Sequence, residues 1–334
     1  AAPKAARAAP PAPATNAADF ASCARRAADV GAQNNCSLEA LAVALHAARP
    51  FRDRLAAKPR PGESDVAAAL REVMAGVAAG EAPSGPNEAL RQALAASGGA
   101  IAAAFAYADA AEVYESLVDA LAADPGSAAA AAALATTGYR LTRKACILCG
   151  DASAAGPRGP VSTLRAVAVT SHAILDLYER AGDAPVFADL VLQARAEEPL
   201  TCGSCGARAC AVVSEFDGLA DVVVVNLNWV AAPAPQAVAA LVRGALGDFA
   251  AAKALNDERS SSSKKLMGIV CFRADHYTCY VRTSAFSLLW TCYDRFHMRG
   301  TGDADWLVDE LAPPAPASGG ERPRPKLPAL LVYV

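Results

Sequence analysis

The sequence has few aromatic residues and little net charge. Only 6% of its 334 residues are aromatic, and 31 basic residues against 34 acidic ones give a formal net charge of −3. Lys and Arg form no clustered face, which excludes the usual electrostatics of a nucleic-acid-binding protein. An intrinsically disordered chain is excluded as well, because charged residues make up only 19% and apolar residues 54% of the sequence.

The sequence also lacks a long hydrophobic segment. No stretch offers the roughly 20 strongly apolar residues of a membrane-spanning helix, and the alanine run from Ser127 to Ala135 is short and weakly apolar. Residues 1–18 form an Ala/Pro-rich, low-complexity lead-in without the leucine-rich core of a secretory signal. The sequence therefore predicts neither a nucleic-acid partner nor a membrane partner.

What the sequence does contain is ten cysteines spread along a chain dominated by alanine. Four of them, Cys146, Cys149, Cys202 and Cys205, form two C-x-x-C-G motifs, which together offer the four thiolates of a structural, tetrahedral Zn²⁺ site. The gap between the motifs exceeds common zinc-finger spacing, so the metal would join two distant hairpins. Separate reduced thiols or disulfides are the alternatives. A zinc site favours a reducing compartment, hence a cytoplasmic or nuclear location.

Apolar periodicity predicts a helical first half and a β-rich second half. In the first half, Pro50 is expected to end the first helix. A serine-rich stretch, Asn256 to Lys265, is expected to be a mobile loop and a candidate gate. The predicted helices are Ser37–Ala48, Asp65–Ala79, Asn87–Ala96, Ala108–Ala122, Ser171–Arg180, Val186–Ala196 and Gln236–Phe249. The predicted strands are Arg140–Leu148, Ala209–Phe216, Asp221–Trp229, Met267–Phe272, Tyr277–Arg282, Ser287–Tyr293 and Ala329–Val334.

Three residues of this pattern suggest nucleophilic chemistry. Cys36 follows Asn35, a typical N-cap residue, and would be the first helical residue, where the helix dipole favours a thiolate. His276 begins one predicted strand and Asp294 follows the next, so a hairpin would place the carboxylate beside the imidazole and orient it. The alternatives are a small buried cysteine and two ordinary hairpin residues.

Several motifs along the chain resemble, in order, those of the catalytic domain of ubiquitin-specific proteases, cysteine proteases that remove ubiquitin. The two C-x-x-C motifs stand where that family has its zinc-ribbon fingers. The matching segments are Gln33–Leu38 (G-N-T-C-x-x-N in the family), Asp109–Glu115 (Q-D-A-x-E-F), His276–Val281 (H-Y-x-x-Y-V), Trp290–Asp294 (W-x-x-F-D) and Leu327–Val334, which is similar to the last strand.

The resemblance implies a papain-like α+β fold in a domain spanning residues 19–334. Its helical thumb would cover about 28–135, its zinc-ribbon fingers about 138–230 and its β-sheet palm about 220–334. It also implies a thiol-dependent deubiquitinase that cleaves the isopeptide bond after the C-terminal glycine of ubiquitin, with ubiquitin and ubiquitinated proteins as partners. The implied site consists of Cys36 as nucleophile, His276 as base, Asp294 as orienting group, and Asn34 and Asn35 as oxyanion candidates.

Some positions depart from the family pattern. Gly31 and Glu39 stand where the family has asparagines, five residues before and three residues after the cysteine. The Cys box, the Asp109–Glu112 segment and the Gly268–Cys271 segment resemble the branch described as inactive ubiquitin-specific peptidases and plant ubiquitin C-terminal hydrolase-related proteins. The alternative function is therefore a catalytically impaired pseudoenzyme that binds ubiquitin or serves as a scaffold. Asp109 and Glu112 either contact substrate or cap a helix.

Overall fold

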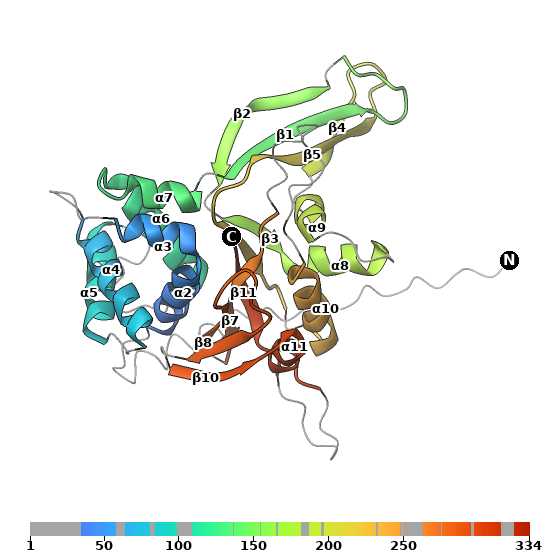
Figure 1. The fold of residues 1–334 in the computed structure, drawn as a ribbon. Coiled ribbons are helices and arrows are strands. Elements are labelled where there is room, and N and C mark those ends of the chain that lie inside the picture. Colours follow the sequence, from blue (N-terminus) through green and yellow to red (C-terminus); the bar gives the residue numbers. More distant parts are fainter. Residues whose placement is uncertain are drawn as a thin grey trace.

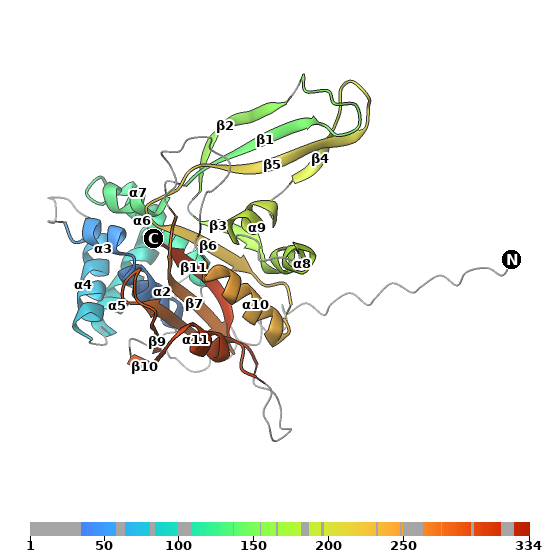
Figure 2. The ribbon, with the colours of Figure 1, turned by 45° about the vertical axis from the view of Figure 1, so that its right-hand side comes forward.

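The computed structural model has a helical lobe, a seven-stranded sheet with helices beyond it, and a second sheet that projects away from both (Figures 1 and 2). The fold class is therefore α+β, as the sequence predicts. The structure describes residues 35–57, 64–80, 84–98, 109–135, 137–153, 155–164, 166–181, 187–194, 197–231, 233–247, 249, 263–274, 276–294, 297–314 and 324–334.

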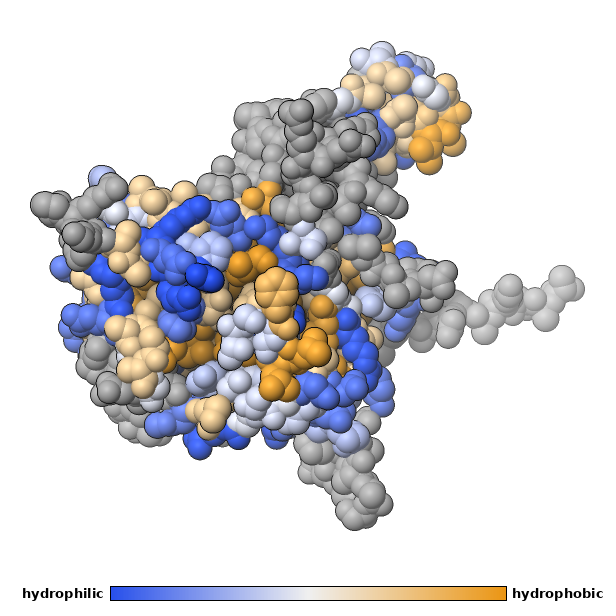
Figure 3. Space-filling view, in the orientation of Figure 1, coloured by the Kyte–Doolittle hydropathy of each residue, from blue (hydrophilic) through white to orange (hydrophobic). Residues whose placement is uncertain are grey.

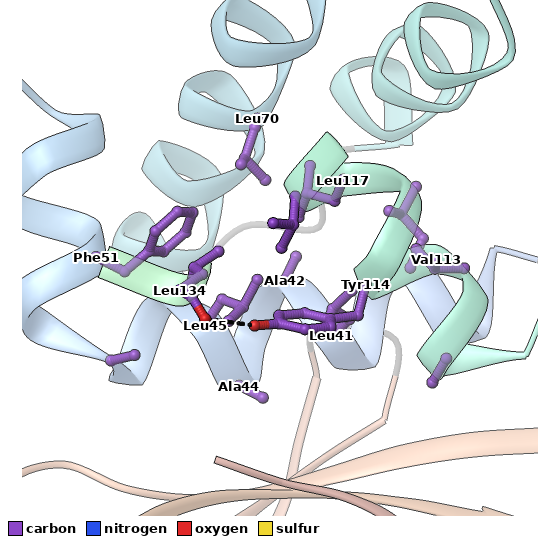
Figure 4. Packing of buried hydrophobic residues seen from close by; sticks show 14 of the residues in the cluster. Leu41, Ala42, Ala44, Leu45, Phe51, Leu70, Val113, Tyr114, Leu117 and Leu134 are labelled. Carbon is purple, nitrogen blue, oxygen red and sulfur yellow. Dashed lines mark hydrogen bonds between the residues drawn. The ribbon is translucent and has the colours of Figure 1, made fainter. Parts of the chain in front are cut away.

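The helical lobe surrounds a central helix, α2, whose residues from Cys36 to Leu45 are all buried except Glu39. A helix that is apolar on every side belongs in a core. Figure 4 shows Leu41 and Leu45 of this helix among side chains of the neighbouring helices, where the hydroxyl of Tyr114 donates a 3.2 Å hydrogen bond to the Leu134 carbonyl. The lobe contains α2 (Cys36–Ala47), α3 (Arg49–Leu55), α4 (Asp65–Ala79), α5 (Ser84–Ala96), α6 (Ala110–Ala123) and α7 (Ala128–Ala135).

The seven-stranded sheet has the strand order β10-β9-β8-β7-β11-β6-β3. The β3–β6 pair is parallel, and the other described strand pairs of this sheet are antiparallel. Its strands are β3 (Val167–Thr170), β6 (Val223–Asn228), β7 (Leu266–Arg273), β8 (His276–Arg282), β9 (Trp290–Asp294), β10 (His297–Gly302) and β11 (Leu327–Tyr333).

Both faces of this sheet are buried. In β11, Leu330 and Val332 pack with the helical lobe, whereas Leu331 and Tyr333 pack with the helices on the opposite face. Because successive strand residues point to opposite faces, a strand covered on both sides is apolar throughout. The helices of the opposite face are α8 (Ser171–Ala181), α9 (Phe187–Ala194), α10 (Pro235–Ala245) and α11 (Ala304–Leu311).

Small residues allow α2 to lie close to the sheet. A Cβ at Gly268 of β7 would be 3.2 Å from the Cβ of Ala44 in α2, tighter than an ordinary contact. Alanine on the helix and glycine on the strand therefore set the distance between the helical lobe and the sheet. Part of the alanine excess of the sequence has this packing role.

The projecting sheet has the order β2-β1-β5-β4 and extends away from the rest of the molecule (Figures 1 and 2). At its tip Ile147 and Leu148 are 81% and 71% exposed, and Figure 3 shows apolar surface there. The strands are β1 (Thr137–Cys146), β2 (Gly156–Leu164), β4 (Glu197–Thr201) and β5 (Arg208–Gly218).

The structure adds elements that the sequence pattern did not predict. α2 ends at Ala47, and a second helix, α3, begins at Arg49. Pro50 lies in the first turn of α3, where no backbone N–H is needed. The unpredicted elements are α3, α7, α11, β2, β3, β4 and β10. None of the helices in the described ranges has the length and apolar composition of a membrane span.

Glycines of β10 make room for an aromatic side chain. A Cβ at Gly302 would lie 2.2 Å from Cγ of Trp306, which packs against the α8–α11 face of the sheet. We expect Gly302→Ala to lower the free energy of unfolding by about 1–3 kcal/mol, because the indole must move out of a packed position. Chemical denaturation measures the change. Gly203→Ala is the matched control, since a Cβ there meets nothing within 4 Å; equal stability of the two variants would contradict the packing argument.

Candidate active site and metal centre

The nucleophile candidate stands at the start of the central helix. α2 begins at Cys36, which is 3% exposed, and Asn35 occupies the N-cap position as the sequence predicts. The Asn35 side chain makes no capping hydrogen bond, and among the described residues its Oδ1 is buried without a partner. The orientation of the first turn is instead held by the backbone, where the Glu39 N–H donates a 2.8 Å hydrogen bond to the Asn35 carbonyl.

His276 and Asp294 are brought together by the β8–β9 ladder. Cys279 of β8 pairs with Tyr293 of β9, so His276 and Asp294 are diagonal neighbours at the same end of the two strands. Nε2 of His276 lies 2.7 Å from Oδ1 of Asp294. An ionised carboxylate only accepts hydrogen bonds, so Nε2 carries the proton and Nδ1 is the basic nitrogen. The two side chains keep 33% and 26% of their surface exposed, which leaves the pair accessible.

The helical lobe meets the sheet at this strand. α2 packs directly against β7, β8 and β9, and Cys36 belongs to the same buried cluster as Tyr277 and Cys279, which follow His276 in β8. The backbone N–H of Ala110, the first residue of α6, donates a 3.4 Å hydrogen bond to the Tyr277 hydroxyl. Two helix starts are thus fixed around the strand that carries the histidine.

Asp109 and Glu112 act locally in the structure. The Asp109 carboxylate accepts a 2.8 Å hydrogen bond from the Ala111 N–H, and the Glu112 carboxylate accepts one of 3.2 Å from the Asp109 N–H. This is a capping box, which satisfies backbone donors at a helix start. The pair therefore fixes the end of α6 that contacts Tyr277.

The two C-x-x-C motifs converge at the tip of the projecting sheet. The four sulfurs of Cys146, Cys149, Cys202 and Cys205 lie within 4.8 Å of one another, and the Cys146–Cys205 and Cys149–Cys202 sulfur pairs are each 3.7 Å apart. Ligand sulfurs around a tetrahedral Zn²⁺ at about 2.3 Å are about 3.8 Å from each other. The donor set and its spacing fit a structural zinc ion.

Each motif folds into the same turn, here called a knuckle: residues 146–150 and 202–206. Gly150 and Gly206 take left-handed backbone angles, with φ of 71° and 73°, and their N–H groups donate 2.9 Å hydrogen bonds to the carbonyls of Cys146 and Cys202. A glycine after the second cysteine is what this turn requires. Inside the first knuckle, the N–H groups of Cys149 and then Leu148 point at the Cys146 sulfur and lower its pKa to about 6, which suits a metal ligand that must be deprotonated.

A carboxylate connects the two knuckles. Asp151, directly after the first, accepts a 2.5 Å hydrogen bond from the Ser204 hydroxyl of the second, and Ser153 donates two more through its backbone and side chain. The hydrogen bond from Ser204 is the largest reason why the pKa of Asp151 falls to about 2. This contact contributes to aligning the four sulfurs.

Four further cysteines lie within the described residues. Cys210, Cys271, Cys279 and Cys292 are buried, and burial raises the pKa of Cys271 and Cys279 well above the ordinary value, which makes those thiols poor nucleophiles. Asn34, Gly31 and Cys23 lie outside the described residues, as does the predicted loop except for residues 263–265, where Lys264 bridges to Phe249.

Sequence reasoning missed one residue at the His–Asp pair. Nε of Arg299, in β10, lies 3.4 Å from Oδ2 of Asp294. No local sequence pattern predicts this contact, because it depends on how β10 is aligned with β9.

No protein-family model and no curated protein matches the sequence. Among solved structures, the chain is similar to one in the SAGA DUB module of Ubp8, Sgf11, Sus1 and Sgf73 bound to monoubiquitin, with a TM-score of 0.54 and 11% identity. The match covers 90% of this chain and 66% of that one, just under two thirds of its length. Together with the cysteine cluster, this likeness confirms the predicted fold: a papain-like α+β hand with a helical thumb (α2–α7), a palm (the seven-stranded sheet) and fingers (the four-stranded sheet).

Proposed function

We propose that this protein is a thiol-dependent deubiquitinase. The observation that carries the proposal is the 2.7 Å contact between His276 and Asp294 on a strand against which the Cys36 helix packs. A histidine oriented by a carboxylate and a cysteine at a helix start are the groups that thiol catalysis of acyl transfer uses. The similar solved structure has a ubiquitin-bound deubiquitinating module, which supports ubiquitin as the substrate class.

In the proposed reaction, His276 Nδ1 takes the Cys36 proton and the thiolate attacks the carbonyl of the ubiquitin C-terminal glycine. The C–N bond breaks, the imidazolium gives its proton to the departing lysine amine, and a thioester remains. Water then adds to the thioester, His276 accepts a proton from that water, and the Cys36 thiol is released. Asp294 keeps the imidazole in the required tautomer and stabilises its cation.

The fingers would hold the body of ubiquitin in this proposal. Bound Zn²⁺ would supply rigidity to the two knuckles through Cys146, Cys149, Cys202 and Cys205, and the exposed Ile147 and Leu148 offer apolar contact surface at the tip. The domain limits of 19–334, with the thumb, finger and palm boundaries given above, belong to the same proposal. So do the relation to the inactive and plant branch, and a cytoplasmic or nuclear location.

A ubiquitin carrying a C-terminal electrophile tests the proposal. We expect the wild-type protein to form a covalent adduct, visible as a mass increase of one ubiquitin, and Cys36→Ala to form none. Cys292→Ala is the matched control, because it removes a buried thiol outside the site and is expected to keep the labelling. The proposal would be overturned if a folded wild-type protein were not labelled and did not bind ubiquitin.

A ubiquitin-binding pseudoenzyme is the second candidate, and one observation favours it. Glu39 lies in the first turn of α2, three residues after Cys36, and Nδ2 of the buried Asn87 donates a 3.2 Å hydrogen bond to its Oε1. A carboxylate fixed close to a thiol opposes formation of the thiolate. Measurable ubiquitin binding without labelling, in the same experiment, would select this function.

A further inference from the structure

The carboxylate of Asp294 has a second charged neighbour besides His276. Its Oδ1 faces the imidazole at 2.7 Å, while its Oδ2 lies 3.4 Å from Nε of Arg299. The two oxygens thus face two different groups, one from β8 and one from β10. Rotation of the carboxylate would disturb both contacts, so the arginine fixes the plane in which Oδ1 meets the histidine.

A local irregularity in β10 places Arg299 at this point. His297 pairs with Asp294 and Met298 with Tyr293, but the register then shifts, and Gly300 rather than Arg299 pairs with Cys292. Arg299 is therefore the extra residue of the strand, with no cross-strand partner in the ladder. Such bulges redirect a side chain and are frequent beside active sites.

The irregularity also separates two packing requirements of the strand. Gly302 must stay free of a side chain, because Trp306 of α11 occupies the space where its Cβ would lie, and a Cβ at Gly300 would be 3.2 Å from Cζ2 of the same indole, tighter than an ordinary contact. With the extra residue, the glycines keep their places under the indole while Arg299 reaches the carboxylate. The same short strand thus provides both the space for Trp306 and the contact of Arg299 with Asp294.

We infer that Arg299 is a positioning residue for the proposed thiol chemistry, acting through Asp294. The inference rests on the proposed function, because that function supplies the substrate. The contacts of Asp294 with His276 and Arg299 do not depend on it. Its contribution is one of orientation rather than stability, since Arg299 is 58% exposed and exposed ion pairs contribute little to folding. Loss of the arginine removes the contact that holds Oδ2, which weakens the alignment of the carboxylate with Nε2 and with it the control of the imidazole tautomer.

The first test does not require ubiquitin. Iodoacetamide alkylates Cys36 when the thiolate sulfur displaces iodide, the thiol proton having passed to His276, and mass spectrometry of the Cys36 peptide gives the rate. We expect Arg299→Ala to slow this alkylation about tenfold, a typical effect of losing a group that orients a reacting residue, and Arg299→Lys to recover most of it. Arg49→Ala is the matched control, because it removes another exposed arginine with an aspartate partner and is expected to leave the rate unchanged.

The second test separates positioning from a general structural effect. On a ubiquitin substrate, Arg299→Ala is expected to lower kcat about tenfold with KM unchanged, and in an Asp294→Asn background the same substitution is expected to add no further loss. Equal alkylation rates for Arg299→Ala and wild type, or a full additional loss in the Asp294→Asn background, would overturn the inference. If Arg299→Ala slows the alkylation but the wild-type protein does not cleave ubiquitin substrates, the proposed function is refuted and the inference on Arg299 stands.

Discussion

Replacement of His276 by alanine is expected to lower kcat/KM on a ubiquitin substrate by about 1,000-fold or more, because it removes the imidazole assigned to take the Cys36 proton. Asp294→Asn should have a smaller effect, since the imidazole remains but its tautomer is no longer fixed by a carboxylate at 2.7 Å. Steady-state cleavage of a ubiquitin conjugate with a fluorescent leaving group measures both.

A second histidine, His46, provides the control for this prediction. His46 lies in α2, ten residues from Cys36, and is half-buried, and its pKa is lowered by desolvation and by the neighbouring Arg52. His46→Gln is expected to keep kcat/KM within about twofold. Equal losses for His276→Ala and His46→Gln would mean that the variants act through stability, and full activity of His276→Ala would refute the assigned base.

Loss of the knuckle cysteines is expected to disorder the tip of the fingers without unfolding the palm. Among the described residues, the tip core consists of four small side chains, Cys146, Cys202, Ala209 and Cys210, with Leu200 and Ala207 packed against them. Such a cluster buries too little apolar area to order two turns, whereas structural zinc contributes apparent binding energies of about 10–16 kcal/mol. The thumb and palm have their own large clusters on the two faces of the sheet.

Hydrogen–deuterium exchange and metal analysis measure this second effect. We expect the purified protein to contain zinc, and a Cys146→Ser/Cys202→Ser variant to contain none and to exchange rapidly in peptides covering 143–151 and 200–210. Peptides from α2 and β11 should keep their protection. Cys210→Ser, a buried cysteine of the same tip that belongs to neither motif, is expected to retain zinc; a zinc-free wild type with equal protection would exclude the metal.

The conformations of short segments were predictable from the sequence. The start of α2 at Cys36 follows from an N-cap residue before an apolar helical pattern, and the apolar runs of β6 and β11 follow from burial on both faces. The C-x-x-C-G pattern contains its own turn, because the glycine supplies the left-handed residue at 150 and 206. In each case the residues that specify the conformation are adjacent in the chain.

Edge strands and short helices were less predictable. β10 contains two glycines and exposed polar residues, and its position depends on pairing with β9 rather than on its own pattern. α7 consists of seven alanines and Leu134 and carries almost no amphipathic signal. Asn35 occupies the predicted N-cap position, yet its side chain makes no capping hydrogen bond.

The sequence by itself therefore determined which residues could carry chemistry: two knuckles, a cysteine at a helix start, and a histidine at a strand start. Tertiary structure decided which of them meet. The convergence of the two knuckles, separated by some fifty residues, the 2.7 Å contact of His276 with Asp294 and the approach of Arg299 all depend on strand register. Register is set by packing across the whole sheet, because a shift of one residue would turn every side chain of a strand to the opposite face.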